Sequence, residues 1–372
     1  MKIIVSGGGT GGHIYPALAV ARGLRQKGWE ILYLGSEGGL EQRVVPGHNI
    51  ELKLIRVNPL PRSPGLKLAK ALAVGVRGLF QANRHIRDFK PDLVLGTGGY
   101  VAGPVLLAAS LRGCPTLIHE QNVYPGITNR LLAYTADRVA LNFRAAREYF
   151  PRNRQGKFVV TGNPVRREIL EASRTRSLAE LGLADNCKTL LVFGGSQGAS
   201  TINRALLDCL DDLLRLDWLQ IIFITGDREY PGVEAELKSR GLESPVESGL
   251  VIKPYLEHME WAYAAADLVL YRAGATGLAE ITARGLPAIL VPYPHATGDH
   301  QHFNARNMAD QGAALMIEDG DLTGDRLCSV LLELLGDESK LQEMSKASSR
   351  LGHPEATDLI IREIENMVES ID

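Results

Sequence analysis

Cysteine is scarce in this chain of 372 residues. Only Cys114, Cys187, Cys209 and Cys328 occur, and they form no CxxC pair and show no metal-ligand spacing. This scarcity excludes a small scaffold held together by disulfides, because such domains depend on many paired cysteines. The sequence instead predicts buried free thiols in a reducing cytoplasm.

An excess of charge of one sign is also missing. The chain contains 41 lysine and arginine residues and 43 aspartate and glutamate residues, which gives a net charge of -2. A protein whose main partner is a nucleic-acid backbone would carry a strong basic excess. We therefore expect no nucleic-acid partner, and any anionic ligand must be met by local groups.

Long hydrophobic segments are absent where export or membrane insertion would need them. Met1-Lys2 leads straight into a strand pattern and then glycines, so we expect no signal segment and no export. Residues Leu93–Leu111 contain no charge and have the length of a membrane span. They are interrupted by Gly96, Gly98, Gly99, Gly103 and Pro104. This interruption predicts a buried strand over Asp92–Leu95, a glycine turn and a packed helix.

The alternation of strand-like and helical runs predicts an α/β protein with two domains, and 45% hydrophobic residues can fill two cores. The first series of strands is Lys2–Ser6, Glu30–Leu34, Glu51–Arg56, Asp92–Leu95, Pro115–His119 and Asp137–Leu141. The second is Lys188–Phe193, Leu219–Thr225, Leu250–Lys253, Asp267–Tyr271, Pro287–Val291 and Ala313–Ile317. Such alternation is typical of two Rossmann-like parallel sheets, each with helices on both faces.

The boundary between the domains is expected where a strand ends in the turn residues Thr161–Pro164. The predicted domains are 1–163 and 164–355, and a final helix over about 356–372 is expected to pack back on the first domain. Ligands of such sheets bind beyond the carboxyl ends of the strands. We therefore expect the site in a cleft that the two domains face.

Two strand-glycine-helix turns are the most informative feature that is present. Ser6–His13 and Phe193–Ala199 each follow a short strand-like run and open a helical segment. Such a turn directs backbone N–H groups and the positive end of a helix dipole at one spot, which suits a phosphate. A single glycine turn could merely supply positive φ angles. Two turns at equivalent places favour two nucleotide-type halves.

Polar side chains follow the strand ends of the first half. His13 lies where the first helix begins, and it is a candidate general base, since imidazole titrates near physiological pH. Alternatively, it caps the helix or hydrogen-bonds a neighbouring loop. The cluster His119-Glu120-Gln121-Asn122 offers donors and acceptors that suit sugar hydroxyls. The alternative is that His119 and Glu120 orient loops.

In the second half, Arg272–Glu280 forms another strand, small-residue turn and helix. Glu280 could accept two hydrogen bonds from a ribose diol, or it could be a solvated helix glutamate. The segment His295–His302 gathers three histidines and Asp299, but its spacing fits no common zinc site. We expect no metal there, and we assign Asp299 and Gln301 to sugar hydroxyls.

A basic and apolar helix is predicted over residues 66–90. Its apolar stripe is expected to contain Leu66, Ala69, Ala73, Val76, Phe80 and Ile86, with Leu72, Val74 and Leu79 as additional exposed residues. Its basic stripe contains Lys67, Lys70, Arg77 and Arg84. Most basic helix faces are merely solvated, but this one, with the proline-containing segment before it, could rest on anionic lipid headgroups.

Taken together, the motifs resemble the MurG family of bacterial peptidoglycan glycosyltransferases (family 28). The motifs that carry the resemblance span nearly the whole chain: Gly8–His13, Gly98-Gly99-Tyr100, His119–Asn122, Gly162–Arg166, Gly194–Ala199, Arg272–Glu280 and Asp299-His300-Gln301. The resemblance implies a GT-B fold and a metal-independent, cofactor-free, inverting transfer of N-acetylglucosamine from its UDP conjugate. The implied acceptor is lipid I, at the cytoplasmic face of the membrane, with cell-wall and division proteins as further partners.

Site residues follow from the same resemblance. Those implied to contact the nucleotide-sugar are Thr10, Gly11, Gly12, Asn122, Arg166, Ser196, Gln197, Leu256, Ala275, Thr276, Gly277, Leu278, Ala279, Glu280 and Gln301. His13 is the favoured base, and Glu120 and Tyr100 are candidates for orienting or assisting the acceptor. The chain departs from the family at Gly277, where a hydroxyl residue is more usual, and at the variable aliphatic Leu256.

Other readings remain open from the sequence. A glycolipid glycosyltransferase of the same fold could use another acceptor such as diacylglycerol, and an epimerase or a non-catalytic nucleotide-sugar binder could share the architecture. A dinucleotide oxidoreductase is disfavoured, because the Gly7–Gly12 turn is not combined with an acidic residue at the end of the second strand, which ends at Leu34-Gly35-Ser36 before Glu37.

Overall fold

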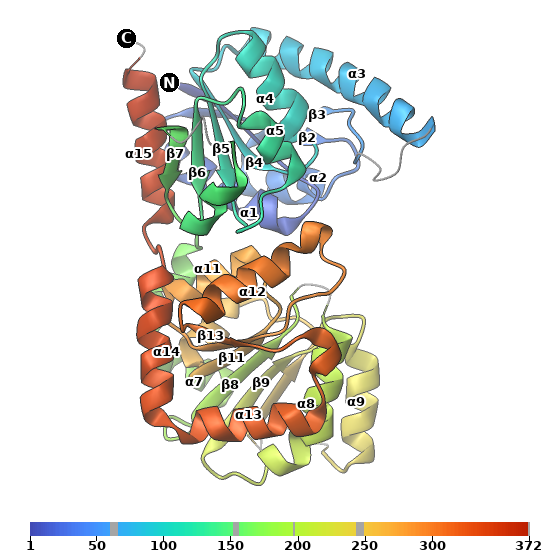
Figure 1. Ribbon diagram of the computed structural model, residues 1–372, viewed down its shortest axis with the longest axis vertical. Coiled ribbons are helices and arrows are strands. Elements are labelled where there is room, and N and C mark those ends of the chain that lie inside the picture. Colours follow the sequence, from blue (N-terminus) through green and yellow to red (C-terminus); the bar gives the residue numbers. More distant parts are fainter. Residues whose placement is uncertain (60–65, 152–155, 196–197, 243–248, 371–372) are drawn as a thin grey trace. The chain divides into compact units, whose positions relative to one another are not determined.

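The computed structural model describes residues 1–59, 66–151, 156–195, 198–242 and 249–370. They form two compact units, each an α/β domain built on one parallel sheet. Unit 1 consists of Met1–Val165 and His353–Asp372, and unit 2 consists of Arg166–Gly352 (Figure 1). The predicted fold class is therefore confirmed.

The sheet of unit 1 has the order β3-β2-β1-β4-β5-β6-β7 in the described residues. Its strands are β1 (Lys2–Gly7), β2 (Glu30–Ser36), β3 (Glu51–Ile55), β4 (Leu93–Gly98), β5 (Thr116–Glu120), β6 (Arg138–Leu141) and β7 (Phe158–Val160). The edge strand β7 lies where a strand is expected to end before Thr161–Pro164, although the predicted series gives it no bounds. The predicted strand, glycine turn and helix in place of a membrane span are present as β4 and α4.

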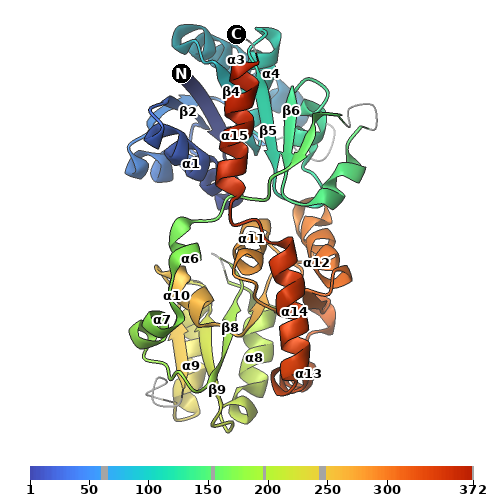
Figure 2. The same cartoon turned by 90° about the vertical axis from the view of Figure 1, so that its left-hand side faces the viewer.

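Helices cover both faces of this sheet. They are α1 (Gly11–Gln26), α2 (Glu41–Val44), α3 (Leu66–Phe89), α4 (Ala102–Leu111), α5 (Ile127–Leu132) and α15 (Ala356–Glu369), with short 3-10 helices η1 (Val45–His48) and η2 (Arg144–Tyr149). Alternate strand residues point to opposite faces: Ile3 and Val5 pack with α1 and α15, whereas Ile4 packs with α3 and α4. Figure 2 shows α15 lying beside α1 on one face.

The sheet of unit 2 has the order β10-β9-β8-β11-β12-β13. Its strands are β8 (Lys188–Phe193), β9 (Leu219–Ile224), β10 (Leu250–Lys253), β11 (Leu268–Tyr271), β12 (Ala288–Leu290) and β13 (Ala314–Met316). Its helices are α6 (Arg167–Glu171), α7 (Arg174–Leu181), α8 (Ser200–Leu213), α9 (Tyr230–Ser239), α10 (Met259–Ala265), α11 (Ala275–Ala283), α12 (His300–Asp310), α13 (Gly324–Gly336) and α14 (Glu338–Leu351), with η5 (Thr297–Asp299) and η6 (Asp319–Asp321).

Strand order decides which loops become neighbours. In unit 1 the order reverses between the adjacent strands β1 and β4, and in unit 2 it reverses between β8 and β11. Ligands of doubly wound sheets bind at such switch points, beyond the carboxyl ends of the strands. Both glycine turns follow switch-point strands, β1 and β8, so each unit places its turn where this rule expects a ligand.

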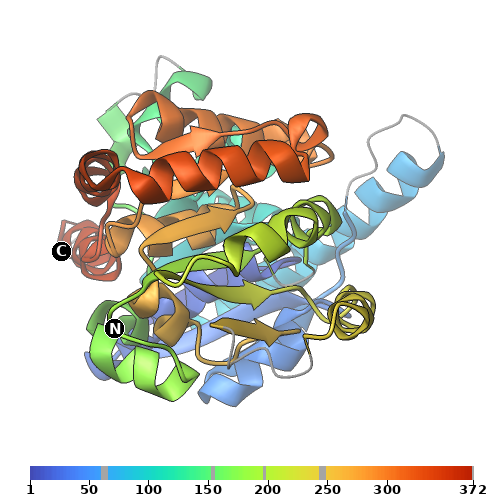
Figure 3. The ribbon, with the colours of Figure 1, turned by 90° about the horizontal axis from the view of Figure 1, so that it is seen from below.

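Helix α3 differs in detail from the predicted amphipathic helix. It projects from the rest of unit 1 (Figure 1 and Figure 3). Its buried side contains Ala82 and Ile86, whereas Val76 and Phe80 are 53% and 69% exposed. The prediction that Ile86 shares one stripe with Val76 and Phe80 is therefore wrong. The side chains of residues 66–70 and 72, and all of residues 60–65, lie outside the described part of the chain.

Candidate active site

The first glycine turn holds the imidazole of His13 in a defined tautomer. His13 is the third residue of α1, and its Nδ1 lies 3.1 Å from the carbonyl oxygen of Gly8 and 3.3 Å from Oγ1 of Thr10. A carbonyl oxygen only accepts hydrogen bonds, so Nδ1 donates, and in the neutral ring the lone pair is therefore on Nε2. This is the form that a general base needs. The loop hydrogen bond and the base role are therefore compatible.

The end of β4 fixes the position of this ring. The hydroxyl of Thr97 donates to the backbone oxygen of His13 at 2.7 Å. A Cβ atom at Gly98, whose φ is +103°, would lie 2.9 Å from Cδ2 and 3.1 Å from Nε2 of His13. Only glycine permits this approach and this backbone conformation. The imidazole therefore packs directly on the backbone of the neighbouring switch-point strand.

A buried carboxylate supports the first glycine turn, and sequence reasoning missed it. Glu41 is fully buried and accepts hydrogen bonds from the backbone N–H of Ser36 at 2.8 Å, from its hydroxyl at 2.5 Å and from the N–H of Gly9 at 3.3 Å. The Gly9 N–H is thus committed to Glu41. An anion is therefore disfavoured at Gly9, because this N–H is occupied and the carboxylate repels negative charge, whereas the predicted contacts are Thr10, Gly11 and Gly12.

The N-terminus of α1 keeps the anion-binding character that the rest of the turn lacks. Thr10 is its N-cap residue and makes no side-chain capping hydrogen bond. The N–H groups of Gly11 and Gly12 lie in the first turn, where a helix offers no carbonyl partner of its own. The sequence signal for the buried Glu41 is Gly38-Gly39, just before it. The carboxylate oxygens of Glu41 lie 2.5 Å from where a Cβ of Gly39 would stand, so a larger residue than glycine would clash there.

Tyr100 is connected to the same carboxylate. Its hydroxyl lies 3.1 Å from Oγ of Ser36. The single hydroxyl proton of Ser36 is directed at Glu41, so Ser36 accepts the proton of Tyr100. The Tyr100 ring also lies against the glycine turn, 3.1 Å from where a Cβ of Gly9 would stand. These contacts give Tyr100 a fixed orientation beside the turn.

The polar cluster after β5 forms many of its hydrogen bonds within its own loop. Glu120 is 1% exposed, and its two oxygens accept from the N–H and side-chain amide of Asn122, from the N–H of Gly126 and from the side-chain amide of Asn129. A carboxylate with four donors is held firmly and orients the loop after β5. The contacts of Glu120 therefore favour the orienting role over proton transfer. Asn122 is half-buried and belongs to this loop.

His119 is the neutral centre of a second hydrogen-bond network. Its Nε2 lies 2.9 Å from the carbonyl oxygen of Gly162, and its Nδ1 accepts from the side-chain amide of Gln121 at 3.0 Å. The same amide donates to the carbonyl oxygen of Thr97 at 2.7 Å. His119 thereby ties the end of β5 to the segment after β7. Burial lowers the pKa of His119 to about 4, with the Gly162 hydrogen bond opposing this shift.

We expect acid to destabilise unit 1 through His119. Its folded pKa of about 4 lies below the ordinary 6.5, so the folded unit binds fewer protons than the unfolded chain. The stabilisation is complete above the unfolded pKa and is lost as the pH falls toward the folded one, by about 3 kcal/mol. Hydrogen exchange of the β4 and β5 amides at pH 7 and pH 4.5 measures it. His119→Gln should show a clearly smaller loss, and equal losses would contradict this assignment.

The second glycine turn leads from β8 into α8. Gly195 and Gly198 have φ angles of +91° and +79°, and a Cβ at Gly198 would lie 2.2 Å from the carbonyl oxygen of Thr225. Helix α8 begins at Ser200, and its N-cap residue makes no side-chain capping bond. The 14-residue helix thus directs uncapped N–H groups toward the turn. Ser196 and Gln197 lie outside the described residues.

Glu280 is buried next to this switch point. It is 7% exposed, so its reading as a solvated helix glutamate is wrong. Nε of Arg166 lies 3.3 Å from its Oε1, and the buried Tyr263 lies close to the same carboxyl. Burial raises the pKa of Glu280, and both groups partly offset the rise. Burial lowers the pKa of Arg166, and the carboxylate more than offsets this, so that the guanidinium stays charged.

The first turn of α11 explains the unusual Gly277. A Cβ there would lie 2.6 Å from the ring and hydroxyl of Tyr271, and a Cβ at Gly274 would also lie 2.6 Å from that hydroxyl. The large Tyr271 at the end of β11 therefore fills the space that a side chain at position 277 would occupy. The remaining predicted contacts of this turn are Ala275, Thr276, Leu278 and Ala279, and they lie on α11 itself.

The other predicted residues of unit 2 surround the same edge of its sheet. Leu256 is buried, and Oε1 of Gln301 accepts from the N–H of Tyr293 at 2.9 Å. Asp299 is exposed with a φ of +56°, directly before α12. His302 contacts Glu318 at 3.0 Å. Across the part of the chain that the structure describes, no three His, Cys, Asp or Glu side chains are grouped to hold a metal ion.

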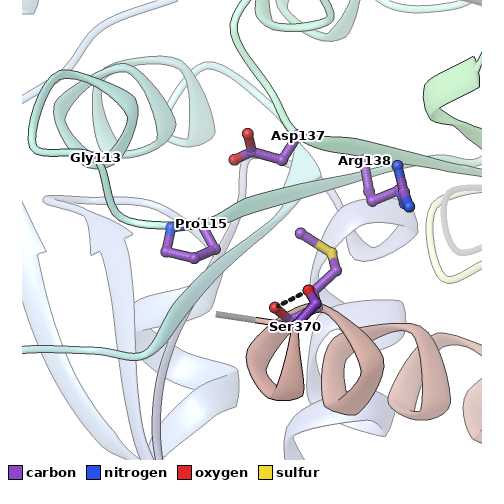
Figure 4. Close-up of a pocket in the computed structure, with 6 residues that line it drawn as sticks. Gly113, Pro115, Asp137, Arg138 and Ser370 are labelled. Carbon is purple, nitrogen blue, oxygen red and sulfur yellow. Dashed lines mark hydrogen bonds between the residues drawn. The ribbon is translucent and has the colours of Figure 1, made fainter. Parts of the chain in front are cut away.

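A hollow of about 340 Å³ lies elsewhere, at the amino ends of β5 and β6 (Figure 4). It is lined by Gly113, Pro115, Asp137, Arg138, Met367 and Ser370. Its charged groups already have partners, because Asp137 accepts from the N–H and hydroxyl of Thr116 and Arg138 pairs with Glu363 at 2.8 Å. This hollow is on the opposite edge of the sheet from the glycine turn.

Family models match both units. Residues 3–141 match the glycosyltransferase family 28 N-terminal domain, and residues 189–360 match the glycosyltransferase family 28 C-terminal domain. The chain belongs to glycosyltransferase family 28. It is also 51% identical to the UDP-N-acetylglucosamine–N-acetylmuramyl-(pentapeptide) pyrophosphoryl-undecaprenol N-acetylglucosamine transferase of Halothermothrix orenii, over 98% of this chain and 99% of that protein. The predicted family resemblance is therefore confirmed.

Solved structures agree with this family. The crystal structure of Acinetobacter baumannii MurG matches with a TM-score of 0.77 and 32% identity, over 98% of this chain and 99% of that chain. A putative UDP-N-acetylglucosamine 2-epimerase from Listeria monocytogenes matches with a TM-score of 0.71 but 15% identity, over 100% and 97% of the two chains. The second likeness shows a shared fold alone. It explains why the architecture by itself left an epimerase open.

Proposed function

We propose that this chain is an inverting hexosyltransferase of peptidoglycan synthesis. It moves N-acetylglucosamine from UDP-N-acetylglucosamine to the C4 hydroxyl of the muramyl sugar in lipid I, which gives lipid II and UDP. The observation that carries this conclusion is the 51% identity over 98% of the chain to a relative named for this transfer. A relative from Bacillus subtilis with the same name is 41% identical over 99% of the chain.

The donor is assigned to unit 2. Glu280 is a buried carboxylate beside the turn of α11, and it can accept two hydrogen bonds from the ribose diol. The uncapped N-terminus of α8 provides N–H groups and a positive dipole end for the diphosphate. Arg166, which lies next to Glu280, contributes a positive charge to the same ligand.

The acceptor and the base are assigned to unit 1. Nε2 of His13 takes the proton of the C4 hydroxyl while that oxygen attacks the anomeric carbon from the side opposite UDP. A new C–O bond forms as the bond from the anomeric carbon to the diphosphate breaks, and UDP leaves with the electron pair. The configuration at the anomeric carbon is thereby inverted. Tyr100 and the loop held by Glu120 orient the acceptor.

Charge on the departing diphosphate is stabilised by groups that are already in place. The N–H groups at the start of α8 and the guanidinium of Arg166 act where negative charge develops. Exclusion of water protects the donor from hydrolysis during transfer.

The deciding experiment is transfer of labelled N-acetylglucosamine from its UDP conjugate to a short-chain lipid I analogue, with the product linkage read by NMR. A β-linked disaccharide is expected. If a good lipid I analogue receives no sugar but diacylglycerol does, diacylglycerol takes the place of lipid I as the acceptor in this proposal. Tight UDP binding without transfer to either acceptor would instead indicate a nucleotide-sugar binder.

We also place the protein at the cytoplasmic face of the cell membrane, as a peripheral protein. No helix among the described residues is long and apolar enough to cross a bilayer. Four exposed apolar side chains lie on the packed helices α3 and α4, and we take them as one apolar patch: Val76, Phe80, Leu107 and Leu111, which are 38–73% exposed. The exposed side chains of Arg77, Arg84 and Arg112 lie on or just after the same helices. Apolar groups beside basic ones suit a surface with anionic lipid headgroups.

Phe80→Asp is expected to weaken binding to anionic phospholipid vesicles by about tenfold or more, because a buried phenylalanine contributes roughly 1.5–3 kcal/mol. Sedimentation with vesicles measures it. The matched control is Leu332→Asp, which changes a 42% exposed leucine on α13 in unit 2. Transfer to a soluble acceptor should be unchanged in both variants. Equal loss of vesicle binding in both would remove the patch from the proposal.

Contacts with cell-wall and division proteins stay a prediction.

A further inference from the structure

Glu41 is a buried carboxylate that the proposed reaction does not yet use. Its Oε1 accepts from the backbone N–H and the hydroxyl of Ser36, whereas its Oε2 accepts from the N–H of Gly9. A Cβ at Gly8 would lie 2.5 Å from Oε1, and a Cβ at Gly35 would lie 2.6 Å from Cγ. These glycines leave the space that the carboxylate occupies. The first glycine turn is therefore built closely around Glu41.

A single peptide group lies between this carboxylate and the imidazole of His13. The carbonyl group of Gly8 and the N–H of Gly9 belong to the same peptide bond, which is trans, so they point in opposite directions. The N–H donates to Oε2 of Glu41 at 3.3 Å, and the carbonyl oxygen accepts from Nδ1 of His13 at 3.1 Å. Two hydrogen bonds in series thus connect the carboxylate to the imidazole.

Hydrogen bonds in series polarise one another. A carboxylate that accepts from the N–H of a peptide group increases the negative charge on the carbonyl oxygen of that group. This oxygen is then a stronger acceptor for Nδ1–H of His13, which fixes the ring and favours the positive charge that the ring acquires when Nε2 takes a proton. In Ser-His-Asp triads a carboxylate accepts directly from Nδ1. Here the Gly8–Gly9 peptide group stands between the two side chains.

We propose that Glu41 is a positioning residue for His13, which orients and polarises the Gly8–Gly9 peptide group and thereby makes Nε2 a better base. This inference rests on the proposed function, because it takes His13 to be the base. Oγ1 of Thr10 also lies 3.3 Å from Nδ1, so Glu41 acts through the shorter of these two contacts.

The first test measures single-turnover transfer to a saturating lipid I analogue. Glu41→Gln keeps the length of the side chain and removes its charge, and it should lower the rate by about tenfold, as expected for a group that orients a histidine from outside the reacting atoms. UDP affinity should stay within about threefold of the wild type. The matched control is Glu37→Gln, which changes an exposed carboxylate before α2 that pairs with Arg56 at 2.9 Å. This control should transfer normally.

A double variant separates positioning from support of the fold. In His13→Ala, the substitution Glu41→Gln should change the remaining rate by less than about twofold, because no imidazole is left to orient. Losses that multiply in His13→Ala/Glu41→Gln would contradict the inference.

A spectroscopic test reads the ring directly. The ¹⁵N resonance of His13 Nδ1 is recorded at about pH 8, above the ordinary pKa of imidazole, and is assigned by its absence from His13→Ala. In Glu41→Gln it should move toward the position of a weaker hydrogen-bond donor, whereas Glu37→Gln should leave it in place. A folded Glu41→Gln with the wild-type resonance would contradict the inference.

The outcomes also separate this inference from the proposed function. Normal transfer by His13→Ala would remove the base, and this inference with it. An impaired His13→Ala together with a folded Glu41→Gln that transfers at the wild-type rate would overturn the role of Glu41 alone. If Glu41→Gln is poorly folded, the wild type decides. Its Gly9 amide proton should then resonate downfield and exchange slowly with solvent, and rapid exchange would overturn the inference.

Discussion

His13→Ala is expected to lower the rate of sugar transfer by about 10²- to 10⁴-fold, the usual contribution of a positioned general base. The affinity for UDP should stay within about threefold of the wild type, because the base acts on the acceptor hydroxyl and not on the nucleotide. The hydrogen bond from Nδ1 to Gly8 is the physical basis, since it orients the ring and makes Nε2 the basic nitrogen of the neutral imidazole. Single-turnover transfer and calorimetric UDP binding measure the two quantities.

Two further measurements make this prediction specific. Imidazole added to His13→Ala should restore part of the rate, because it can occupy the vacated space and accept the proton. His48→Ala, which alters a half-buried histidine in the 3-10 helix η1 of the same unit, is the matched control and should transfer normally. Parallel loss of transfer and UDP binding in His13→Ala would assign the histidine to ligand binding instead.

Glu280→Ala is expected to produce the opposite division of effects. A hydrogen bond to a charged group contributes about 1.5–3 kcal/mol, so losing the ribose contact should weaken binding of UDP-N-acetylglucosamine by about 10- to 100-fold. The rate at saturating donor should fall much less, because the carboxylate does not touch the reacting atoms. The measurement is KM for the donor against kcat, together with direct UDP binding.

The structure supplies controls for this prediction. Glu280→Gln keeps the volume of the buried side chain, so it tests the charge without opening a cavity. Glu260→Gln removes a neighbouring carboxylate that affects Glu280 only through its charge and that pairs with His258 at 2.8 Å. It should leave donor binding nearly unchanged. A normal KM for the donor in Glu280→Gln and Glu280→Ala would eliminate the ribose contact.

The carboxylate Glu41 illustrates why part of the site could not be read from the chain. Gly38-Gly39 permit a close approach of this side chain, but its full burial arises only when β2 is paired beside β1 and brings Ser36 and Gly9 within reach. The internal saturation of Glu120 is similar, because its donors come from a loop whose course depends on α5 packing against β5. Hydrogen-bond saturation is a property of three-dimensional neighbours, and sequence spacing does not contain it.

The α/β class, nearly all the strands and the two glycine turns follow from the order of the residues alone. Strands buried on both faces appear as short runs of β-branched and aliphatic residues, and turns that need positive φ require glycine, so both are local properties. The contact of Gly98 with the His13 ring, the burial of Glu280 beside Arg166 and the solvent-facing side of α3 become visible only in the folded chain. These features depend on the order of strands within each sheet and on packing between segments far apart in the chain, and no local pattern encodes them.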